Sequence, residues 1–161
     1  MREKYFWPSI RLVMSGIFLW AFFDKLLGLG FATEAPRSWL SGGSPTAGFL
    51  KFGTEGGVFA SYFQSLSGNV FVDFLFMAGL FLVGLALLLG IGLRIAGYAG
   101  SLMMFLIYLS LFPPVNNPLL DEHIVYITVL LGIARSNAGN YFGLGKVWGQ
   151  MKLVKKYPLL K

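Results

Sequence analysis

Long apolar stretches alternate with short polar segments along this chain. Four of the stretches predict membrane-crossing helices, because a helix needs about 20 mostly apolar residues to cross the hydrocarbon core of a bilayer. They cover about residues 8–30, 70–90, 94–112 and 120–139. The pattern therefore predicts an all-α fold, with a four-helix transmembrane bundle formed by one domain over residues 1–161.

Helix-breaking residues mark the ends of these stretches. Pro8 suits a first helical turn, and Pro113 and Pro114 stop the third stretch. The apolar centre of the fourth stretch, residues 124–134, is short, so this helix is expected to use residues on both flanks to cross. Glycines inside the stretches are interpreted as close-packing contacts between helices: Gly79, Gly84, Gly97 and Gly100.

The segment between the first two stretches, residues 31–69, is long. In its second half, residues 48–66, apolar side chains recur on one side of a helix, at positions 58, 59, 62, 63 and 66. We expect a short amphipathic helix in this external loop, either lying on the outer membrane surface or forming a re-entrant element. A cap on the bundle and a gate for substrate are both compatible with this pattern.

Charge adds an orientation to this picture. The chain has 13 Lys and Arg against 7 Asp and Glu, and the basic residues gather near Arg11, Arg94 and the tail 140–161. The loop 113–123 has no Lys or Arg. The positive-inside rule therefore places both termini in the cytoplasm and loop 31–69 outside the cell membrane. This clustering favours anionic membrane lipids over nucleic acid as the partner of the basic residues.

Cysteine is absent, and His123 is the single histidine. Disulfides, iron–sulfur clusters and cysteinyl zinc sites are thereby excluded, and one chain cannot supply two axial histidines to a haem. We expect no metal site, with a carboxylate–histidine site at residues 121–123 as a weak alternative. The N-terminal stretch is too long for a signal peptide and is interpreted as an uncleaved first span.

Charged side chains within or beside spans are candidates for function, because burying a charge in lipid is costly. Antiparallel spans are expected to bring a group of charged and polar residues together at the outer membrane level: Asp24, Lys25, Asp73, Asn116, Asn117, Asp121, Glu122 and His123. An unpaired Lys25 would be expensive, so we expect it to pair with Asp24 or Asp73. The group either only holds the bundle together or also forms a polar pocket that binds a ligand.

His123 has two interpretations. Histidine gains and loses a proton near neutral pH, so beside Asp121 and Glu122 it could move protons, or it could simply cap the fourth span. Toward the inner side lie Arg11, Arg94 and Arg135, which are interpreted as structural, since arginines at helix ends usually reach toward lipid head groups.

Several motifs resemble the DoxX/DoxD family of small four-span membrane proteins, most closely its DoxD-like branch, the membrane subunit of thiosulfate:quinone oxidoreductases. The residues that carry the resemblance are Arg11, Gly16, Phe18, Asp24-Lys25, Gly92-Leu93-Arg94, Asn116-Asn117-Pro118, Asp121-Glu122-His123, the run 134–139, Gly143-Leu144-Gly145 and Trp148. The long first loop is also typical of that branch. Where the family often has an acidic residue beside the last glycine motif, this chain has Lys146.

The resemblance implies a quinone-reducing subunit that acts with a second, DoxA-like small subunit and is associated with a quinol oxidase. Thiosulfate would be oxidised to tetrathionate outside the membrane, and the electrons would pass to membrane quinone. In this hypothesis Lys25, paired with Asp24 or Asp73, donates to a quinone carbonyl, and residues 121–123 relay protons. The remaining expected contacts to quinone or thiosulfate are Trp20, Phe22, Phe23, Arg37, Lys51, Asn116 and Asn117.

Two other functions remain open. The chain could be a non-catalytic accessory or anchor subunit of a membrane oxidoreductase, with its polar groups serving only packing. It could also be a small-solute transporter, which four spans could serve only as an oligomer. Inverted repeats would favour the transporter, and the sequence shows none.

Overall fold

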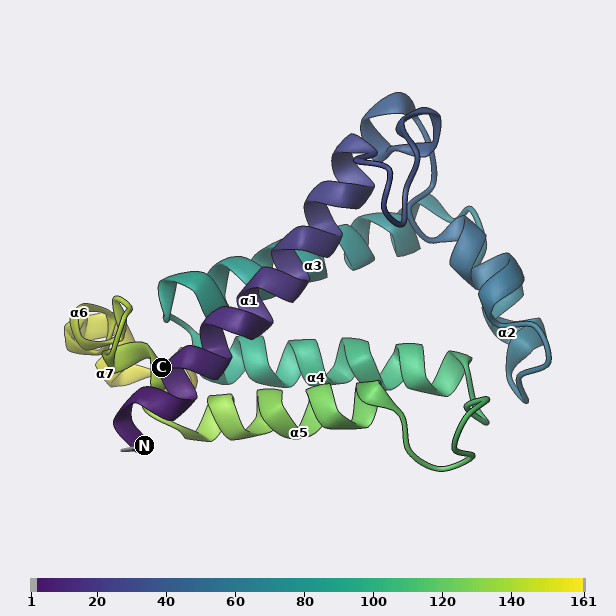
Figure 1. The fold of residues 1–161 in the computed structure, drawn as a ribbon. Coiled ribbons are helices and arrows are strands. Elements are labelled where there is room, and N and C mark those ends of the chain that lie inside the picture. The colour runs from purple at the N-terminus through teal and green to yellow at the C-terminus, as the bar shows by residue number, and fades with distance from the viewer. Residues whose placement is uncertain (1–2, 161) are drawn as a thin grey trace.

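The computed structural model describes residues 3–160, and in this range it contains helices and no strands (Figure 1). The four long helices are α1 (Glu3–Leu27), α3 (Val70–Leu89), α4 (Leu93–Ser110) and α5 (Glu122–Arg135). The shorter elements are α2 (Ala60–Ser65), α6 (Gly145–Gln150), α7 (Lys152–Lys156) and helical turns at Ala35–Arg37, Trp39–Ser41, Phe49–Gly53, Ala138–Asn140 and Pro158–Leu160. The predicted all-α fold is confirmed.

Helices α3 and α4 are long and apolar enough to span a membrane. Only 33% of the apolar stretch of α3 and 39% of that of α4 is buried inside the protein. The core helix of a soluble protein would be mostly buried, so these two helices instead turn much of their apolar surface outward. The exposed side chains include Phe71, Phe74 and Leu82 on α3, and Leu102 on α4.

Four spanning helices are predicted, but among the described residues only α3 and α4 are both long and apolar enough to cross a membrane. Helix α5 has 14 residues and rises only about 21 Å, whereas the hydrocarbon core is about 30 Å thick. It ends at Arg135 rather than near residue 139, because Ser136 takes an extended conformation. Helix α1 is 25 residues long and has the buried, charged Arg11 in its first half.

Local signals explain most helix boundaries. The side chain of Asn69 caps α3 by accepting hydrogen bonds from the backbone N–H groups of Phe71 at 2.9 Å and Val72 at 3.3 Å. Gly90 ends α3 with a φ of +72°, a conformation that glycine adopts without strain. The sequence predicts Pro8 in the first turn of its helix. Helix α1 begins earlier, at Glu3, so this proline lies inside the helix.

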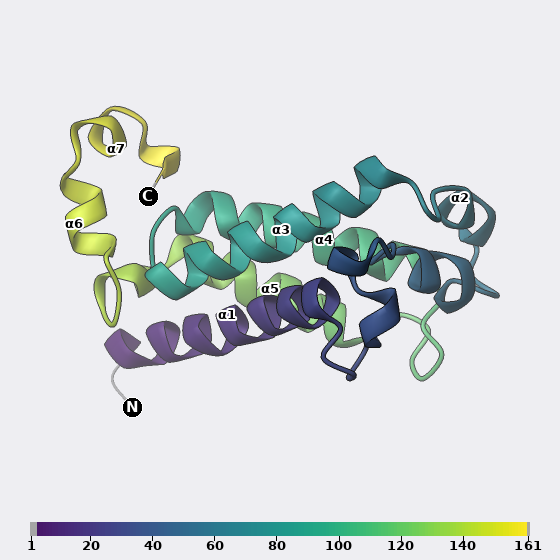
Figure 2. The same ribbon diagram turned by 90° about the horizontal axis from the view of Figure 1, so that it is seen from above.

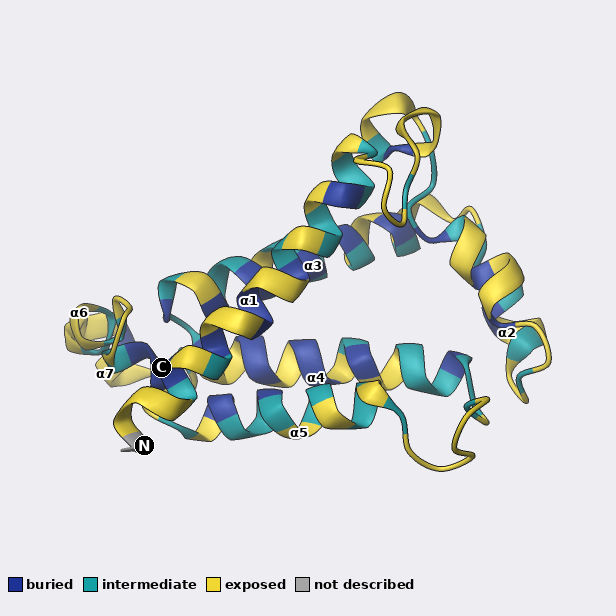
Figure 3. Ribbon diagram, viewed as in Figure 1, coloured by how far each residue is buried: buried dark blue, intermediate teal, exposed yellow. Residues whose placement is uncertain are grey.

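The long helices pack as two pairs, α1 with α3 and α4 with α5; α1 crosses α3 and α4 runs beside α5 (Figure 1; Figure 2 gives the view from above). The pairs are close at the end that holds both termini, called here the terminal end. They diverge toward the opposite end, called the loop end (Figure 1). The buried core joins all four helices (Figure 3): Met14, Phe18, Met77, Leu80, Val83, Leu87, Leu93, Met104, Leu130 and Ile133.

Small residues let the helices approach closely. A Cβ atom on Gly97 of α4 would lie 2.6 Å from Cβ of Ala134 and 2.7 Å from the backbone oxygen of Leu130, both on α5. A Cβ atom on Gly84 of α3 would lie 2.8 Å from Cγ of Leu19 on α1. Both contacts leave no room for a side chain, which confirms that these two glycines are packing contacts.

The first loop is folded, but its helix is shorter than predicted. Helix α2 has six residues; of its apolar side chains Phe63 is buried, while Tyr62 is 65% exposed. The backbone N–H of Val58 donates to the carbonyl of Phe112 at 2.9 Å, so the loop is fastened to the end of α4. This contact fits the interpretation of the segment as a cap on the bundle.

The C-terminal segment, predicted as a cytoplasmic tail over residues 140–161, is folded against the terminal end over its described part. Trp148 donates from Nε1 to the carbonyl of Leu160 at 2.5 Å, and Arg94 donates from Nη1 to the carbonyl of Pro158 at 3.0 Å. The backbone N–H of Leu144 also donates to the carbonyl of Leu89 at 2.8 Å. These bonds fix α6 and α7 beside α4.

Candidate functional site

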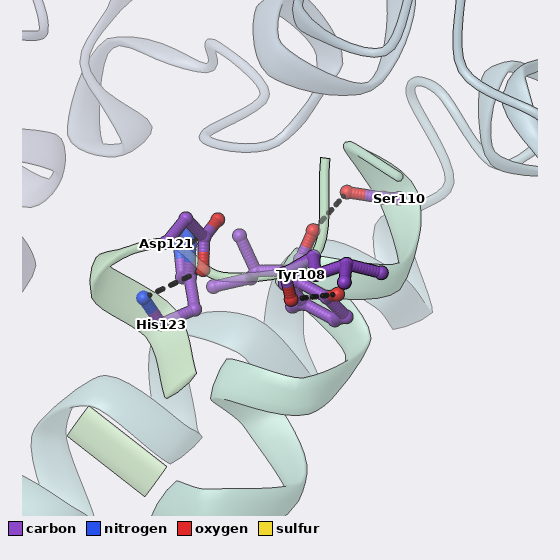
Figure 4. Close-up of polar contacts among 6 residues, drawn as sticks. Tyr108, Ser110, Asp121 and His123 are labelled. Atoms are coloured by element: carbon purple, nitrogen blue, oxygen red, sulfur yellow. Dashed lines mark hydrogen bonds and ion pairs between the residues drawn. The ribbon is translucent and has the colours of Figure 1, made fainter. Parts of the chain in front are cut away.

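Asp121 and His123 form an ordered pair at the start of α5 (Figure 4). Asp121 is the N-cap residue: one carboxylate oxygen accepts a hydrogen bond from the backbone N–H of His123 at 3.0 Å. The other oxygen lies 2.9 Å from His123 Nδ1. The two side chains are only 11% and 13% exposed. One carboxylate thus begins the helix and orients the imidazole ring.

The turn between α4 and α5 supports this pair. Tyr108, near the end of α4, donates from its hydroxyl to the carbonyl of Leu119 at 2.8 Å. The Asn117 side chain accepts from the backbone N–H groups of Leu119 at 3.0 Å and Leu120 at 3.2 Å. Ser110 donates to the carbonyl of its own helix at Ile107 (Figure 4). These bonds hold the turn that positions Asp121 and His123 beside α4.

The geometry suits proton transfer. Within the described residues the second ring nitrogen of His123, Nε2, makes no hydrogen bond. A carboxylate on one nitrogen orients the ring and leaves the other nitrogen free to exchange a proton with a ligand. Exposed apolar side chains, including Leu119 at 67% and Leu120 at 59%, lie next to the pair. The pair therefore borders on an apolar surface.

Glu122 does not join the ion pair and is exposed. Its carboxylate, that of Asp121 and the ring of His123 nevertheless offer ligand atoms within 4.8 Å of one another. One oxygen of Asp121 is already used by a backbone N–H. The carboxylate–histidine metal site thus stays the weak alternative that the sequence predicts.

The carboxylates of Asp24 and Asp73 have a different task. Asp24, which is 2% exposed, accepts hydrogen bonds from the backbone N–H groups of Phe31 at 3.2 Å and Ala32 at 3.1 Å. One oxygen of Asp73, a residue only 5% exposed, accepts from the Ser44 hydroxyl at 2.9 Å. The same oxygen accepts from the Thr46 hydroxyl at 2.6 Å and backbone N–H at 3.2 Å. Both carboxylates therefore hold the first loop onto the helix ends.

The predicted ion pair of Lys25 is wrong. Among the described residues Lys25 pairs with neither Asp24 nor Asp73. The physical reason is that both carboxylates are turned toward hydrogen-bond donors of the first loop. Lys25 is partly buried near the end of α1, where the charge of Asp24 acts on it without direct contact.

The groups predicted to converge at one level lie at one end of the fold, but they do not form one cluster. Asp24, Lys25 and Asp73 lie at the loop end of the α1–α3 pair, while Asp121 and His123 lie at the loop end of the α4–α5 pair. These two ends are separated in space (Figure 1). The divergence of the helix pairs is the reason: antiparallel order brings residues to one end of a bundle, but it does not bring them into contact.

The other expected binding residues are dispersed. Arg37 forms an exposed ion pair with Glu34 at 3.8 Å. Trp20 is 52% exposed and packs edge-on against Phe31. The remaining positions are Phe22, which packs against Phe81; Phe23, which packs against Phe22; Asn116, which is exposed; and Lys51, which lines an open recess of about 460 Å³ with Phe52, Glu55, Gln64 and Ser67. Neither Trp20 nor Phe22 lines this recess.

Arg11 corrects the expectation that the inner arginines reach toward lipid. Its guanidinium is fully buried and donates from Nη1 to the carbonyls of Leu87 and Leu88, the latter at 2.8 Å. From Nη2 it donates to Phe142 at 2.7 Å and more weakly to Tyr141 at 3.4 Å. Arg11 thus joins α1, the C-terminal end of α3 and the chain after α5, whereas Arg94 and Arg135 are exposed.

Sequence reasoning missed Ser44, Thr46 and Tyr108. Thr46 is a short polar residue in a loop, and only the fold shows that it bonds to Asp73, 27 residues away. Tyr108 lies inside an apolar stretch, where an aromatic residue predicts packing and not a hydrogen bond across a turn. A polar tip on a residue close to a helix end was the one available signal for Tyr108.

Replacing Asp73 with alanine should release the first loop. The change removes the acceptor of three hydrogen bonds, so we expect the protein to lose about 2 kcal/mol of stability. Limited proteolysis in detergent should then cut near residues 44–47 faster than in the wild-type protein. Glu55→Ala, which removes an exposed carboxylate from the same loop, is the matched control and should leave the cleavage rate unchanged. Equal cleavage of both variants would contradict the anchoring role of Asp73.

No family model, curated protein or solved structure matches this chain. The resemblance to the DoxX/DoxD family therefore depends on the sequence motifs quoted above. Those motifs fall at both ends of the fold: Asp121 and His123 lie at the loop end, and Arg11 and Arg135 lie at the terminal end.

Proposed function

We propose that this chain is a membrane subunit of a quinone-reducing oxidoreductase, which passes electrons from thiosulfate to membrane quinone. The observation that carries the proposal is the Asp121–His123 pair, whose carboxylate lies 2.9 Å from Nδ1 and whose Nε2 makes no hydrogen bond within the described chain. A proton donor held in this way beside an apolar surface suits a ligand that is itself apolar and takes up protons. The resemblance to the DoxD-like branch supports the same reaction.

In this proposal all four long helices cross the membrane, with both termini in the cytoplasm. The apolar outer surfaces of α3 and α4 and the basic terminal end support this orientation. Helix α5 would use residues 116–121 and 136–140 on its flanks to complete its crossing. The loop end would then face the outside, where thiosulfate arrives.

The reaction divides between electrons and protons. Oxidation of two thiosulfate ions to one tetrathionate releases two electrons, and reduction of quinone to quinol consumes two electrons and two protons. His123 would give a proton from Nε2 to a quinone oxygen, and the carboxylate of Asp121 would hold the ring in place for the transfer. Exposed Glu122 would return protons from water. Leu119 and Leu120 would offer an apolar surface to the quinone ring.

Thiosulfate binding would need a partner. The cations near the loop end are Lys25, Lys51 and Arg37, and Arg37 is already paired with Glu34. These groups lie apart, so they do not form one anion site. We therefore assign most of the thiosulfate site, and the first step of electron transfer, to a second small subunit of the DoxA-like kind.

The proposal is tested with membranes that contain this chain and its partner subunit. We expect thiosulfate-dependent reduction of a short-chain ubiquinone or menaquinone analogue, followed by absorbance, with tetrathionate formed in a one-to-one ratio to quinol. Membranes that contain the partner alone should be inactive. The absence of activity in membranes where both proteins are folded would overturn the thiosulfate reaction.

An accessory or anchor role is the second candidate, and the hydrogen bonds of Asp24 and Asp73 favour it. Both carboxylates are used in folding the first loop, as expected of a scaffold. If this role is correct, activity will be lost when the chain is absent but kept in a chain carrying both His123→Gln and Lys25→Met. Loss of activity in His123→Gln with a normally assembled complex would decide for the quinone-reducing subunit.

A further inference from the structure

A basic recess lies at the terminal end of the fold, away from the Asp121–His123 pair. Its volume is about 380 Å³, and its walls come from the start of α4, the end of α5 and helix α6. Cationic side chains from all three elements line it, namely Arg94, Arg135 and Lys146. We refer to these three residues and their surroundings as the terminal recess.

No acidic side chain lines the terminal recess among the described residues. The six acidic residues with described side chains all lie at the loop end or in its loops: Asp24, Glu34, Glu55, Asp73, Asp121 and Glu122. A fourth positive charge stands behind the wall, since a Cβ atom on the lining residue Gly90 would lie 3.2 Å from Arg11 Nη1. The hydrogen-bond partners of Arg11 are neutral carbonyls, so its charge is not cancelled locally.

The recess also offers hydrogen-bond donors suited to phosphate. Two of its lining residues, Asn137 and Asn140, make no side-chain hydrogen bond within the described structure. The guanidinium of Arg135 presents paired donors, a geometry that matches phosphate oxygens. Arg94 donates from Nη1 to the carbonyl of Pro158 and keeps Nε and Nη2 as donors. Arg135 is held only by a 3.4 Å contact to the carbonyl of Leu131 and by stacking over Tyr98. Its charge therefore remains available to a ligand.

The surroundings of the recess indicate a lipid and not a soluble phosphate compound. On α6, α7 and the turn after them, exposed apolar side chains such as Val147, Leu153 and Leu159 alternate with lysines. Segments of this composition lie in the plane of a membrane surface, with apolar side chains in lipid and lysines among the head groups. The recess thus opens beside a segment suited to contact lipid.

We propose that the terminal recess binds the phosphate group of an anionic phospholipid, through Arg94, Arg135 and Lys146. The asparagine side chains donate further hydrogen bonds to the head group, and the acyl chains lie along the outer apolar surfaces of the helices. The bound lipid neutralises the cluster of cations and fastens the C-terminal segment to α4 and α5. This role does not depend on the quinone reaction.

The test uses the full chain, delipidated in an uncharged detergent, with phosphatidylglycerol as the probe and native mass spectrometry to count bound lipids. The variant Arg135→Gln/Lys146→Gln removes two charges from the recess. Its control, Lys152→Gln/Lys155→Gln, removes two charges from α7 outside the recess. We expect saturable binding of one lipid. Its dissociation constant should rise about tenfold or more in the recess variant and less than about threefold in the control.

Three other outcomes would overturn the proposal. Equal weakening in both variants, each with the wild-type melting temperature before lipid is added, would show a diffuse basic surface and no site. Binding of phosphatidylcholine as tight as that of phosphatidylglycerol would show that the negative charge of the lipid is not recognised. Binding of inorganic phosphate or glycerol 1-phosphate that the recess variant loses, with no binding of phosphatidylglycerol, would assign the site to a soluble phosphate compound.

Discussion

Replacing Arg11 with methionine will lower the free energy of unfolding of this protein by about 3 kcal/mol or more. The guanidinium is fully buried and donates to carbonyls of two segments that are distant in sequence, around Leu88 and Phe142. Methionine keeps much of the volume but leaves these carbonyls without their donors. Because one side chain joins α1, α3 and the chain after α5, the loss will spread to the C-terminal segment.

The measurement is thermal unfolding in detergent, followed by intrinsic tryptophan fluorescence, since the chain has four tryptophans and no cysteine for thiol dyes. Lys152→Met, which removes an exposed cation from the same end of the fold but outside the terminal recess, is the control and should change the melting temperature little. Arg11→Lys should be intermediate, because one ammonium group cannot reach all of the carbonyls. A melting temperature of Arg11→Met equal to that of the control would contradict the role assigned to Arg11.

Arg11 also shows where the sequence stops being informative. An arginine near the end of a predicted span resembles one that reaches for lipid head groups, and nothing local distinguishes the two cases. Its partners at residues 141 and 142 follow α5 and return to α1 only because the C-terminal segment is folded. This folding was not predictable from residues 140–161, which have neither a long apolar stretch nor a clear helical period.

Helices α3 and α4, in contrast, were predictable almost to the residue. Each combines a continuous apolar stretch with local boundary signals. Asn69 starts and Gly90 ends α3, and α4 ends shortly before Pro113. The information lies within the helix and its immediate neighbours. Helix α5 has weaker apolar character, so its predicted end at residue 139 overshot the end at Arg135.

The candidate site divides in the same way. Asp121 and His123 are two residues apart at a helix start, so their contact follows from local geometry. The cap that the sequence suggested for His123 is supplied by Asp121 instead. The expected pairing of Lys25 with Asp73 does not form, because Thr46 of the first loop donates a hydrogen bond to the Asp73 carboxylate instead. Contacts that depend on how a long loop closes cannot be read from the charges of the helices alone.

The second large effect concerns His123. In membranes that contain the partner subunit, His123→Gln should lower kcat for thiosulfate-dependent quinone reduction about a hundredfold, the usual contribution of a positioned proton donor. Glutamine can still donate a hydrogen bond to the carboxylate of Asp121 but cannot carry a proton to the quinone. The KM for quinone should change far less than kcat, because the apolar surface at Leu119 and Leu120 is unaltered.

Two substitutions at Asp121 separate proton transfer from helix capping. Asp121→Asn keeps a capping oxygen for the backbone N–H of His123 but removes the negative charge that lies 2.9 Å from Nδ1. It should therefore lower kcat while leaving the melting temperature nearly unchanged. Asp121→Ala loses both roles, so kcat should fall and the protein should also be destabilised by about 1 kcal/mol. Wild-type activity in Asp121→Asn and in His123→Gln would contradict proton transfer at this pair, and the remaining role of Asp121 would then be to cap α5.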